Sequence, residues 1–483
     1  MDIQNEKKHL AEAFFQSLMK KNSHAPLVDY GLPGPFICSR KKLLILSVKL
    51  GLHLRKNSHS QRIGIILPPG LAGTIANLAV LFAGKIPVNL NFSLGSNIAE
   101  NLIQKAEIKT IISATKMMNK FPDFPWTDDL FEISTWLQKI SLTPYRLIKE
   151  AILLQFPYQL ARFFLKIPSK IDSEEATLLF TSGSSGEPKG VVLTHQNILS
   201  NCSQINRLGL FDKDAKILAN LPLFHSFGFT VSTCFPLLYN IPFVTVPSPL
   251  DVKSGLHAIQ KERITFLLGT PTFLRGFLNK GKSEDFESIR YVVAGAEKTE
   301  SSFKKKWEEF ANCSYLEGYG LTETSPGISF NLPKEGSREG SVGHLFSDIE
   351  CKTIHPETRE DLKVGESGLL CFRGPNIFSG YLNDFEKTNE VLTKENWFVT
   401  GDIGYLDQDD FLFIKGRLSR FSKIGGEMVP HETIEANIKQ ILSNQNDGET
   451  SLVVMGQPDP NKGEQLVLVS DQEIDFLELR KKL

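Results

Sequence analysis

Residues 181–190 (Thr-Ser-Gly-Ser-Ser-Gly-Glu-Pro-Lys-Gly) combine hydroxyl side chains, glycines and one lysine, a combination suited to holding phosphate. The apolar run at 176–180 predicts a buried strand before them, and the glycines allow the loop to turn back with its amide groups pointing inward. Such a group of N–H donors binds anions, and the mobile point charge of Lys189 suits a polyphosphate. The candidate phosphate ligands are Thr181, Ser182, Gly183, Ser184, Ser185, Gly186, Lys189 and Gly190.

Two other interpretations of this stretch exist. Clusters of glycine and serine often form flexible surface loops, which is the first alternative. The second is a Walker A loop, which requires Gly-Lys-Ser/Thr at the start of a helix. Here Lys189 is followed by Gly190 and then by the strand-like residues 191–194, so an ordinary P-loop is excluded.

The elements that must position this loop alternate between strands and helices. The hydrophobic pattern predicts helices at 10–22, 40–55, 71–83, 97–106 and 195–206. It predicts strands at 62–67, 86–90, 108–112, 217–221, 243–246, 265–268 and 290–293. Alternation of this kind indicates doubly wound α/β layers. From residue 340 onward, short strands such as 367–374 and 410–414 indicate a small β-rich subdomain.

Length and composition exclude several classes of protein. The chain has 483 residues, of which 41% are hydrophobic and 23% charged, as expected for a globular protein with two or three cores. A net charge of -1 gives no support to nucleic-acid binding as its main task. The six cysteines show no C-x-x-C spacing, and no secretory signal or apolar run long enough to span a membrane is found. We therefore expect a cytoplasmic protein.

Residues 142–166 interrupt the alternation of strands and helices. They combine bulky apolar residues with four basic ones (Arg146, Lys149, Arg162, Lys166), and Pro157 breaks the pattern. One interpretation is a broken amphipathic helix that lies on the inner face of the membrane as a peripheral contact. The other is an excursion packed on its own domain.

Four further stretches join the phosphate loop in a recognisable order. They are Ala-Gly-Ala-Glu at 294–297, Glu-Gly-Tyr-Gly-Leu-Thr-Glu-Thr at 317–324, Trp-Phe-Val-Thr-Gly-Asp at 397–402 and the Lys-Gly-Arg-rich segment at 415–427. With 181–190, they resemble the acyl-adenylate-forming (AMP-binding) superfamily, which includes acyl-CoA synthetases, acyl-[acyl-carrier-protein] synthetases and peptide-synthetase adenylation domains. The resemblance implies ATP and Mg²⁺ as cofactors.

The resemblance also implies nucleotide contacts. In the family, the turn with Gly295, Ala296 and Glu297 lies along the adenine. Tyr319 and Gly320 belong to the stretch that stacks on it, and Asp402 and Arg417 reach the ribose. Each motif also has a structural alternative: a strand-to-helix turn at 294–297 and an Asx-turn at Asp402.

Catalytic roles follow from the same resemblance. Thr322 would donate to an α-phosphate oxygen, and Glu323 is a hard oxygen ligand suited to Mg²⁺. His225 falls at the family position beside the carboxylate and the acyl entrance, although a lone histidine is often structural. Lys423, with Gly425 and Gly426, matches the segment that faces the thiol in the second step.

Several stretches, such as 88–92, 221–228 and 420–429, look most like the synthetase half of the bacterial 2-acylglycerophosphoethanolamine acyltransferase/acyl-[acyl-carrier-protein] synthetase. This branch implies activation of a fatty acid to acyl-AMP and transfer to the phosphopantetheine thiol of acyl carrier protein. Coenzyme A is the alternative acceptor. Both are anionic and would use Arg417, Arg420 and Lys423, so charge does not choose between them.

The resemblance implies an α/β fold with two domains. Residues 1–417 would form an adenylate-forming domain of two doubly wound α/β subdomains and the small β-rich subdomain. Residues 418–483 would form a short, truncated α+β domain that swings about a hinge at Ser419. Family members end in a Gly-Lys element whose lysine serves adenylation, and nothing in 479–483 matches it. Three alternatives stay open: a truncated form, slow adenylation, or a catalytically impaired binder of nucleotide or acyl-adenylate.

Overall fold

The structure is a computed structural model that describes most of the chain. The described residues are 8–20, 26–32, 34–171, 174–181, 188–333, 337–424, 427–443, 451–459, 463–472, 474 and 479. The chain divides into two compact units. Unit 1 comprises Met1–Ile349 and Gly374–Glu390, and unit 2 comprises Glu350–Arg373 and Val391–Leu483. A domain boundary after Arg417 stays a prediction.

The first part of unit 1 is a parallel sheet in the order β4-β3-β5-β6. Its strands are β3 (Arg62–Ile66), β4 (Ile86–Asn89), β5 (Thr110–Ser113) and β6 (Asp129–Glu132). Its connecting helices are α3 (Leu71–Phe82), α4 (Ser96–Lys105) and α5 (Thr115–Lys120), and α2 (Arg40–Asn57) precedes β3. The predicted alternation of strand and helix is confirmed here.

A larger sheet forms the centre of unit 1, with the order β15-β14-β13-β12-β11-β9-β10-β1-β2. The strands from β13 to β1 are parallel, and β2, β14 and β15 are antiparallel to their neighbours. The bounds are β1 (Leu27–Asp29), β2 (Phe36–Cys38), β9 (Ile217–Ala219), β10 (Phe243–Thr245), β11 (Phe266–Gly269), β12 (Tyr291–Ala294), β13 (Ser314–Gly320), β14 (Gly327–Phe330) and β15 (Ser341–Leu345).

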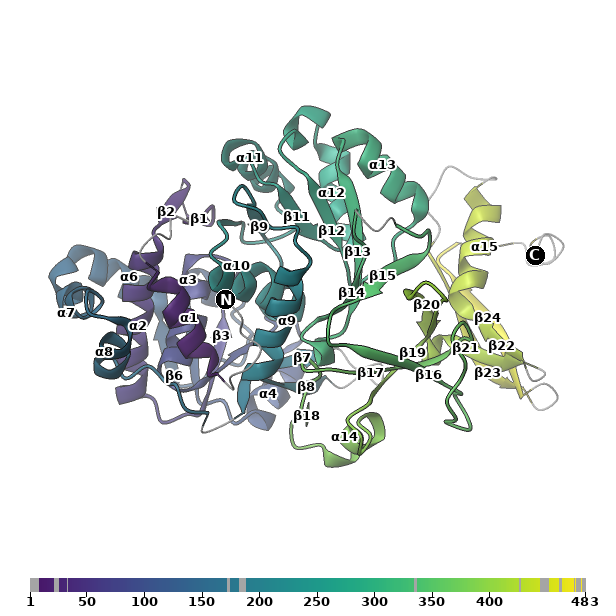
Figure 1. Ribbon diagram of the computed structural model, residues 1–483, viewed down its shortest axis with the longest axis horizontal. Helices are drawn as coiled ribbons and strands as arrows, with labels where there is room; N and C mark the ends of the chain where they lie inside the picture. Colours follow the sequence, from purple (N-terminus) through teal and green to yellow (C-terminus); the bar gives the residue numbers. More distant parts are fainter. Residues whose placement is uncertain are drawn as a thin grey trace. The chain divides into compact units, whose positions relative to one another are not determined.

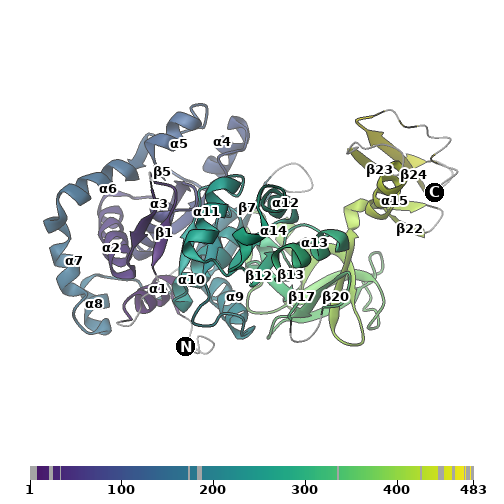
Figure 2. The same cartoon turned by 90° about the horizontal axis from the view of Figure 1, so that it is seen from above.

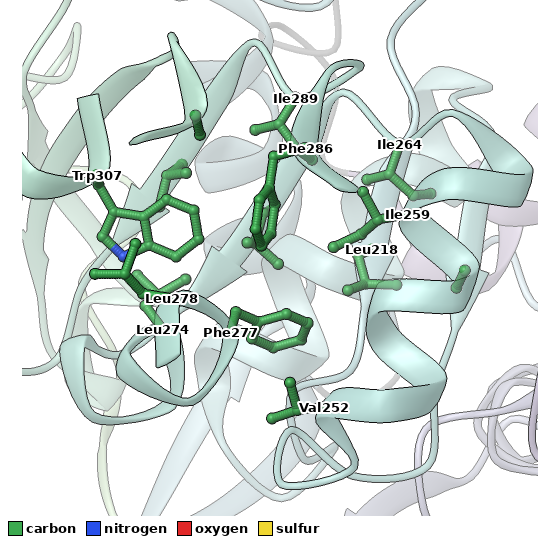
Figure 3. Packing of buried hydrophobic residues seen from close by; sticks show 14 of the residues in the cluster. Leu218, Val252, Ile259, Ile264, Leu274, Phe277, Leu278, Phe286, Ile289 and Trp307 are labelled. Carbon is green, nitrogen blue, oxygen red and sulfur yellow. The ribbon is translucent and has the colours of Figure 1, made fainter. Parts of the chain in front are cut away.

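Helices α11 (Val252–Glu262), α12 (Pro271–Lys280) and α13 (Ser301–Ala311) gather on one face of this sheet (Figure 1). Their apolar sides meet the strands in a buried cluster, in which the rings of Phe277, Phe286 and Trp307 lie among branched aliphatic side chains (Figure 3). The helix starts are fixed locally: Asp251 accepts from the Ser254 amide, and Pro271 is the first residue of α12. The cluster therefore holds the carboxyl ends of β11, β12 and β13 at fixed positions.

A small antiparallel sheet, β18-β8-β7, carries the phosphate-loop sequence. It consists of β7 (Glu175–Thr181), β8 (Lys189–Thr194) and β18 (Gly380–Tyr381). Helix α9 (His195–Arg207) follows β8 directly and begins with a capping box between Thr194 and Asn197. The π-helix η2 (Phe227–Cys234) and α10 (Phe235–Tyr239) lie between β9 and β10 in the chain.

The segment that interrupts the alternation is helical. It contains α6 (Ile133–Leu142), η1 (Pro144–Leu147), α7 (Ile148–Leu153) and α8 (Tyr158–Phe164), and it packs on α2 and on α1 (Leu10–Leu18). Figure 2 shows this run of helices passing around α2. Among the described residues, no helix is both long and apolar enough to cross a membrane.

Unit 2 contains two antiparallel sheets. The first consists of β16 (Glu350–Ile354), β17 (Gly368–Arg373), β19 (Phe398–Leu406) and β20 (Phe411–Arg417). The second has the order β22-β21-β24-β23 and packs with α15 (His431–Ser443). Its strands are β21 (Phe421–Ile424), β22 (Glu427–Pro430), β23 (Leu452–Asp459) and β24 (Gly463–Ser470). The turn η5 (Leu418–Arg420) joins the two sheets, and α14 (Phe385–Val391) crosses the boundary between the units.

The buried cluster of unit 1 gives the first prediction. Phe277 is 1% exposed, so Phe277→Ala removes a packed ring and leaves a cavity. We expect this change to lower the free energy of unfolding by about 3–5 kcal/mol. The matched control is Phe385→Ala, because Phe385 is 83% exposed. Thermal unfolding of both variants measures the difference, and equal midpoints would contradict the packing described here.

Candidate functional site

The two ends of the predicted phosphate loop lie side by side on neighbouring strands. Thr181, the last residue of β7, pairs with Lys189, the first residue of β8, and Gly190 pairs with Phe180. Ser182, Gly183, Ser184, Ser185 and Gly186 lie outside the described residues, so their role as phosphate ligands stays a prediction. The pairing of the two strands therefore fixes the backbone position of Lys189.

Lys189 belongs to a cluster of three side chains from distant parts of the sequence. Its ammonium nitrogen lies 5.3 Å from the centre of the Tyr381 ring, within range of a cation–π interaction. The Tyr381 hydroxyl donates a hydrogen bond of 2.8 Å to Oε1 of Glu323. Tyr381 thus connects the predicted phosphate-binding lysine to the predicted metal ligand. Sequence analysis missed this tyrosine, because β18 has only two residues and its pairing with β8 is long-range.

The backbone around Glu323 is held by the segment that carries Tyr381. Glu323 lies in the turn η4 (Thr322–Thr324), directly after β13. The Phe378 amide donates to the Glu323 carbonyl (2.8 Å), and the side-chain amide of Asn376 donates to the Thr324 carbonyl (2.7 Å). Ser325 in turn donates to the Asn376 carbonyl (2.9 Å). These bonds fix the backbone of η4, which carries Thr322 and Glu323, and the Tyr381 hydroxyl orients the Glu323 side chain.

The donor set around Glu323 fits one kind of metal site. Among the described residues, no group of three or more His, Cys, Asp or Glu side chains could hold a metal ion by itself. Mg²⁺, however, is often held by one or two carboxylates, with water and substrate phosphates supplying the other oxygens. Glu323 is partly exposed and is oriented by Tyr381, so it fits such a site.

Gly320 allows the chain to turn from β13 into η4. A methyl group on Gly320 would lie 1.8 Å from the Pro326 carbonyl oxygen, so only glycine fits here. The pairing of β13 with β14 shifts between Tyr319 and Gly320. The motif 317–324 therefore ends in a strand bulge followed by a tight turn.

Earlier in β13, burial raises the pKa of Glu317, although the Lys304 ammonium lies 3.5 Å from its carboxylate and opposes this effect.

The structure brings three predicted stretches together at the carboxyl end of β12. Ala294 pairs with Glu317, so the turn after β12 lies next to β13. A methyl group on Gly295 would lie 3.5 Å from the Gly318 carbonyl oxygen and 3.7 Å from the ring of Phe227. The turn at 294–297, the motif at 317–324 and the segment at 222–228 are therefore neighbours, as a shared ligand would require.

The turn at 294–297 also has a structural task. Ala296 adopts a left-handed conformation with φ of 68°. The carboxylate of Glu297 accepts from the Thr272 amide (3.1 Å) and hydroxyl (2.7 Å), at the start of α12. A carboxylate at a helix N-terminus stabilises the helix. Glu297 thus fixes α12, and its predicted contact with adenine stays a prediction.

His225 follows β9 in the segment that neighbours Gly295. Its ring lies 4.7 Å from that of Phe224, and its side chain is exposed. The surrounding protein nevertheless desolvates the charged imidazolium, and this lowers the pKa of His225 below its usual value of 6.5. The side chain is therefore neutral at neutral pH, a form that can orient an oxygen by one hydrogen bond.

Unit 2 brings Asp402 and Arg417 together. The two residues are directly opposite each other on β19 and β20, and Nε of Arg417 lies 3.3 Å from Oδ1 of Asp402. The Asp402 side chain is 5% exposed, whereas that of Arg417 is 55% exposed. The amide of Asp402 donates to the Thr400 hydroxyl (3.0 Å). The exposed guanidinium of Arg417 therefore lies beside the buried carboxylate of Asp402. The contact of these two residues with ribose stays a prediction.

The remaining predicted residues of unit 2 lie beyond Arg417. Ser419, the predicted hinge, lies in η5, and Lys423 lies in β21, with its side chain outside the described part of the structure. Arg420 forms an ion pair with Glu435 (2.5 Å) and donates to the Val454 carbonyl (3.1 Å). These partners hold Arg420 inside unit 2, which makes it less suited to docking an acidic partner.

Comparison with known proteins shows which family the sequence matches. A family model described as AMP-binding enzyme matches residues 39–382. The long-chain-fatty-acid–CoA ligase of Bacillus subtilis is 29% identical over 450 residues, covering 87% of this chain and 79% of that ligase. A 4-coumarate–CoA ligase-like protein of Arabidopsis thaliana is 32% identical over 299 residues, covering 60% of this chain. The chain spans about half the length of this plant relative, 52%.

Solved structures share the fold. ATP-bound MatB from Rhodopseudomonas palustris has a TM-score of 0.78 at 22% identity, with 98% of this chain and 91% of that chain covered. O-succinylbenzoate coenzyme A synthetase (MenE) from Bacillus subtilis, in complex with ATP and magnesium ion, has a TM-score of 0.78 at 21% identity, with 99% and 92% covered. The predicted α/β fold class is confirmed.

The environment of His225 gives the second prediction. In an NMR titration we expect the His225 imidazole to titrate with a midpoint below 6.5, because desolvation disfavours its charged form. His225→Gln assigns the signal. The unfolded chain then binds this proton more tightly than the folded chain, so the stability contributed by neutral His225 is lost as the pH falls below 6.5. A midpoint at or above 6.5 would contradict the desolvation.

Proposed function

This chain belongs to the AMP-binding enzyme family, and on that premise we propose that it is a fatty acyl-[acyl-carrier-protein] synthetase that uses ATP and Mg²⁺. It activates a fatty acid to acyl-AMP and transfers the acyl group to the phosphopantetheine thiol of acyl carrier protein. The observation that carries the proposal is the cluster of Lys189, Tyr381 and Glu323 at the loop end of the β7–β8 hairpin.

The chemistry of the first step explains why this cluster is needed. A carboxylate is a poor electrophile, so its oxygen attacks the α-phosphorus of ATP. A new P–O bond forms, and the bond from the α-phosphorus to the bridging oxygen breaks, which releases pyrophosphate. Negative charge builds on the phosphates in this step, and groups fixed in advance can stabilise it. Lys189 supplies a positive charge, and Thr322 supplies a hydroxyl donor beside Glu323.

Several of the other predicted residues receive a role in this proposal. Glu323 and the phosphate oxygens would hold Mg²⁺, which would neutralise charge on the leaving pyrophosphate. Gly295, Ala296, Tyr319 and Gly320 would border the adenine, and the neutral imidazole of His225 would orient the fatty carboxylate. In unit 2, we assign ribose binding to Asp402 and Arg417.

In the second step, the thiol attacks the acyl carbonyl carbon. A C–S bond forms, the C–O bond to AMP breaks, and the thiol proton is released. The branch-specific stretches at 221–228 and 420–429 support acyl carrier protein as the acceptor. The Bacillus subtilis relative is named a long-chain-fatty-acid–CoA ligase, and this name supports the second candidate, an acyl-CoA ligase. We assign Lys423 to this thiol step in either case.

Pyrophosphate release with a long-chain fatty acid tests the acceptor. We expect kcat/KM to be at least about tenfold higher with holo-acyl carrier protein than with coenzyme A, a difference of about 1.4 kcal/mol. Apo-carrier protein is the matched control, because it has the same surface but no thiol.

Faster turnover with coenzyme A would replace the proposal with the acyl-CoA ligase. Binding of ATP with no pyrophosphate release would instead indicate a catalytically impaired binder of nucleotide or acyl-adenylate.

Tyr381→Phe tests the cluster itself. The change keeps the ring beside Lys189 and removes the hydroxyl that donates to Glu323. Hydrogen bonds to charged groups contribute about 1.5–3 kcal/mol, so we expect pyrophosphate release to slow roughly tenfold to a hundredfold. The Mg²⁺ concentration for half-maximal rate should also rise, which loss of general stability would not explain.

Tyr158→Phe is the matched control for this experiment. The Tyr158 hydroxyl donates to Glu12 (2.6 Å), so the control removes a similar tyrosine–glutamate bond elsewhere in unit 1. The cluster has no role in metal binding if both variants show the same Mg²⁺ dependence.

A further inference from the structure

The helical segment 142–166 exposes an unusual amount of apolar surface. Six large apolar side chains in it each expose more than half of their surface; Leu142 is 84% exposed and Phe163 is 73% exposed. We call these six the apolar face. They are Leu142, Tyr145, Ile148, Ile152, Phe163 and Phe164. Single exposed apolar residues are common on proteins, but several in one short segment mark an interaction surface.

The spacing of these residues places them on common sides of their helices. Tyr145, Ile148 and Ile152 are three and four residues apart along η1 and α7, so they lie on one side. In α8, Leu160 lies three residues before Phe163 and four before Phe164, so both rings are its neighbours on the helix surface, and the two rings lie 5.6 Å apart. The exposed side chains therefore gather on one side of η1 and α7 and on one side of α8.

The opposite sides of the same helices are fixed to α1 and α2. Glu150 of α7 is buried and pairs with Lys49 of α2 (3.0 Å). In α8, Tyr158 donates to Glu12 of α1 (2.6 Å), and Arg162 lies 3.6 Å from the same carboxylate. Figure 1 and Figure 2 both draw α7 and α8 at the edge of unit 1, outside α1 and α2. These anchors decide that the apolar face points away from unit 1.

The charges around the apolar face have one sign. Residues 133–171 contain a single acidic residue, Glu150, and it is turned inward and paired. Five basic residues of the same stretch are exposed. They are Lys139, Arg146, Lys149, Lys166 and Lys170. The surface thus combines exposed aromatic and aliphatic side chains with an uncompensated positive charge.

We propose that this surface binds the headgroup layer of a membrane that contains anionic lipids. An interfacial helix buries its apolar side at the boundary between headgroups and acyl chains, while its basic residues attract acidic headgroups. A second copy of the chain fits less well, because pairing two such surfaces would bring like charges together. The protein would lie on the membrane and not cross it.

Co-sedimentation with lipid vesicles tests the proposal on the full chain. We expect binding to vesicles of phosphatidylcholine and phosphatidylglycerol, and at least about tenfold weaker binding to phosphatidylcholine alone. Raising the salt to about 0.5 M should weaken the binding, because it screens the headgroup charge. Phe163→Ser/Phe164→Ser and Arg146→Glu/Lys149→Glu should each lower the affinity at least about tenfold.

Two control variants keep the test specific. Phe385→Ser removes an even more exposed ring outside the segment, and Lys305→Glu/Lys306→Glu reverses two exposed charges on α13. We expect both to bind vesicles like the unchanged protein, and thermal unfolding checks that all variants fold. Equal binding by all variants, or no binding by the unchanged protein, would overturn the proposal. A dimer in the absence of lipid that Phe163→Ser/Phe164→Ser abolishes would identify a second copy as the occupant instead.

Discussion

The candidate site of unit 1 depends on buried asparagines that satisfy backbone carbonyls across distant segments. Asn376 is fully buried and donates to the carbonyls of Thr324 and Gly327. Asn197 of α9 donates to the carbonyls of Pro375 and Ile377, which flank Asn376. A buried carbonyl without a donor costs free energy, so these hydrogen bonds favour this arrangement of the segments. Through it, α9 holds both Glu323 and Tyr381.

The same arrangement explains how Lys189 becomes part of the site. Residues 189–194 form β8, and α9 begins directly after it with the capping box of Thr194 and Asn197. Asn197 thus caps the helix that follows the β7–β8 hairpin and also holds the segment that carries Tyr381. A change in the position of α9 would therefore move the lysine, the tyrosine and the carboxylate together. This coupling gives the cluster its fixed geometry before any ligand binds.

Helices α7 and α8 carry charged residues on the side that faces α1 and α2 and exposed apolar residues on the outer side. In most surface helices of globular proteins this distribution is reversed. Their inner sides carry the charged partners of Lys49 and Glu12, whereas their outer sides carry aromatic and branched aliphatic residues. Partly buried ion pairs fix orientation more than they add stability, since desolvation offsets much of their attraction. The inner pairs therefore explain how apolar residues stay exposed without the segment turning over.

Local sequence determined most of the elements and the order of the motifs. The period of apolar residues predicted α2, α3, α9 and the strands β3, β4, β5, β9, β10, β11 and β12 to within a few residues, because burial on one face repeats at short range. The strands β1, β6 and β13 were not predicted. Glycine, hydroxyl and lysine residues marked 181–190 as a predicted phosphate loop, since these residue types suit the binding of anions.

The tertiary structure alone decided the contacts between distant residues. Tyr381 lies in a two-residue strand with no periodic signal, and only its pairing with β8 brings it to Glu323. The Glu297 carboxylate accepts from the Thr272 amide at the start of α12, a contact that no local pattern indicates. The register of β19 and β20 sets Asp402 opposite Arg417. Local patterns record which side of an element is buried, whereas the partner of a side chain depends on how separate elements pack.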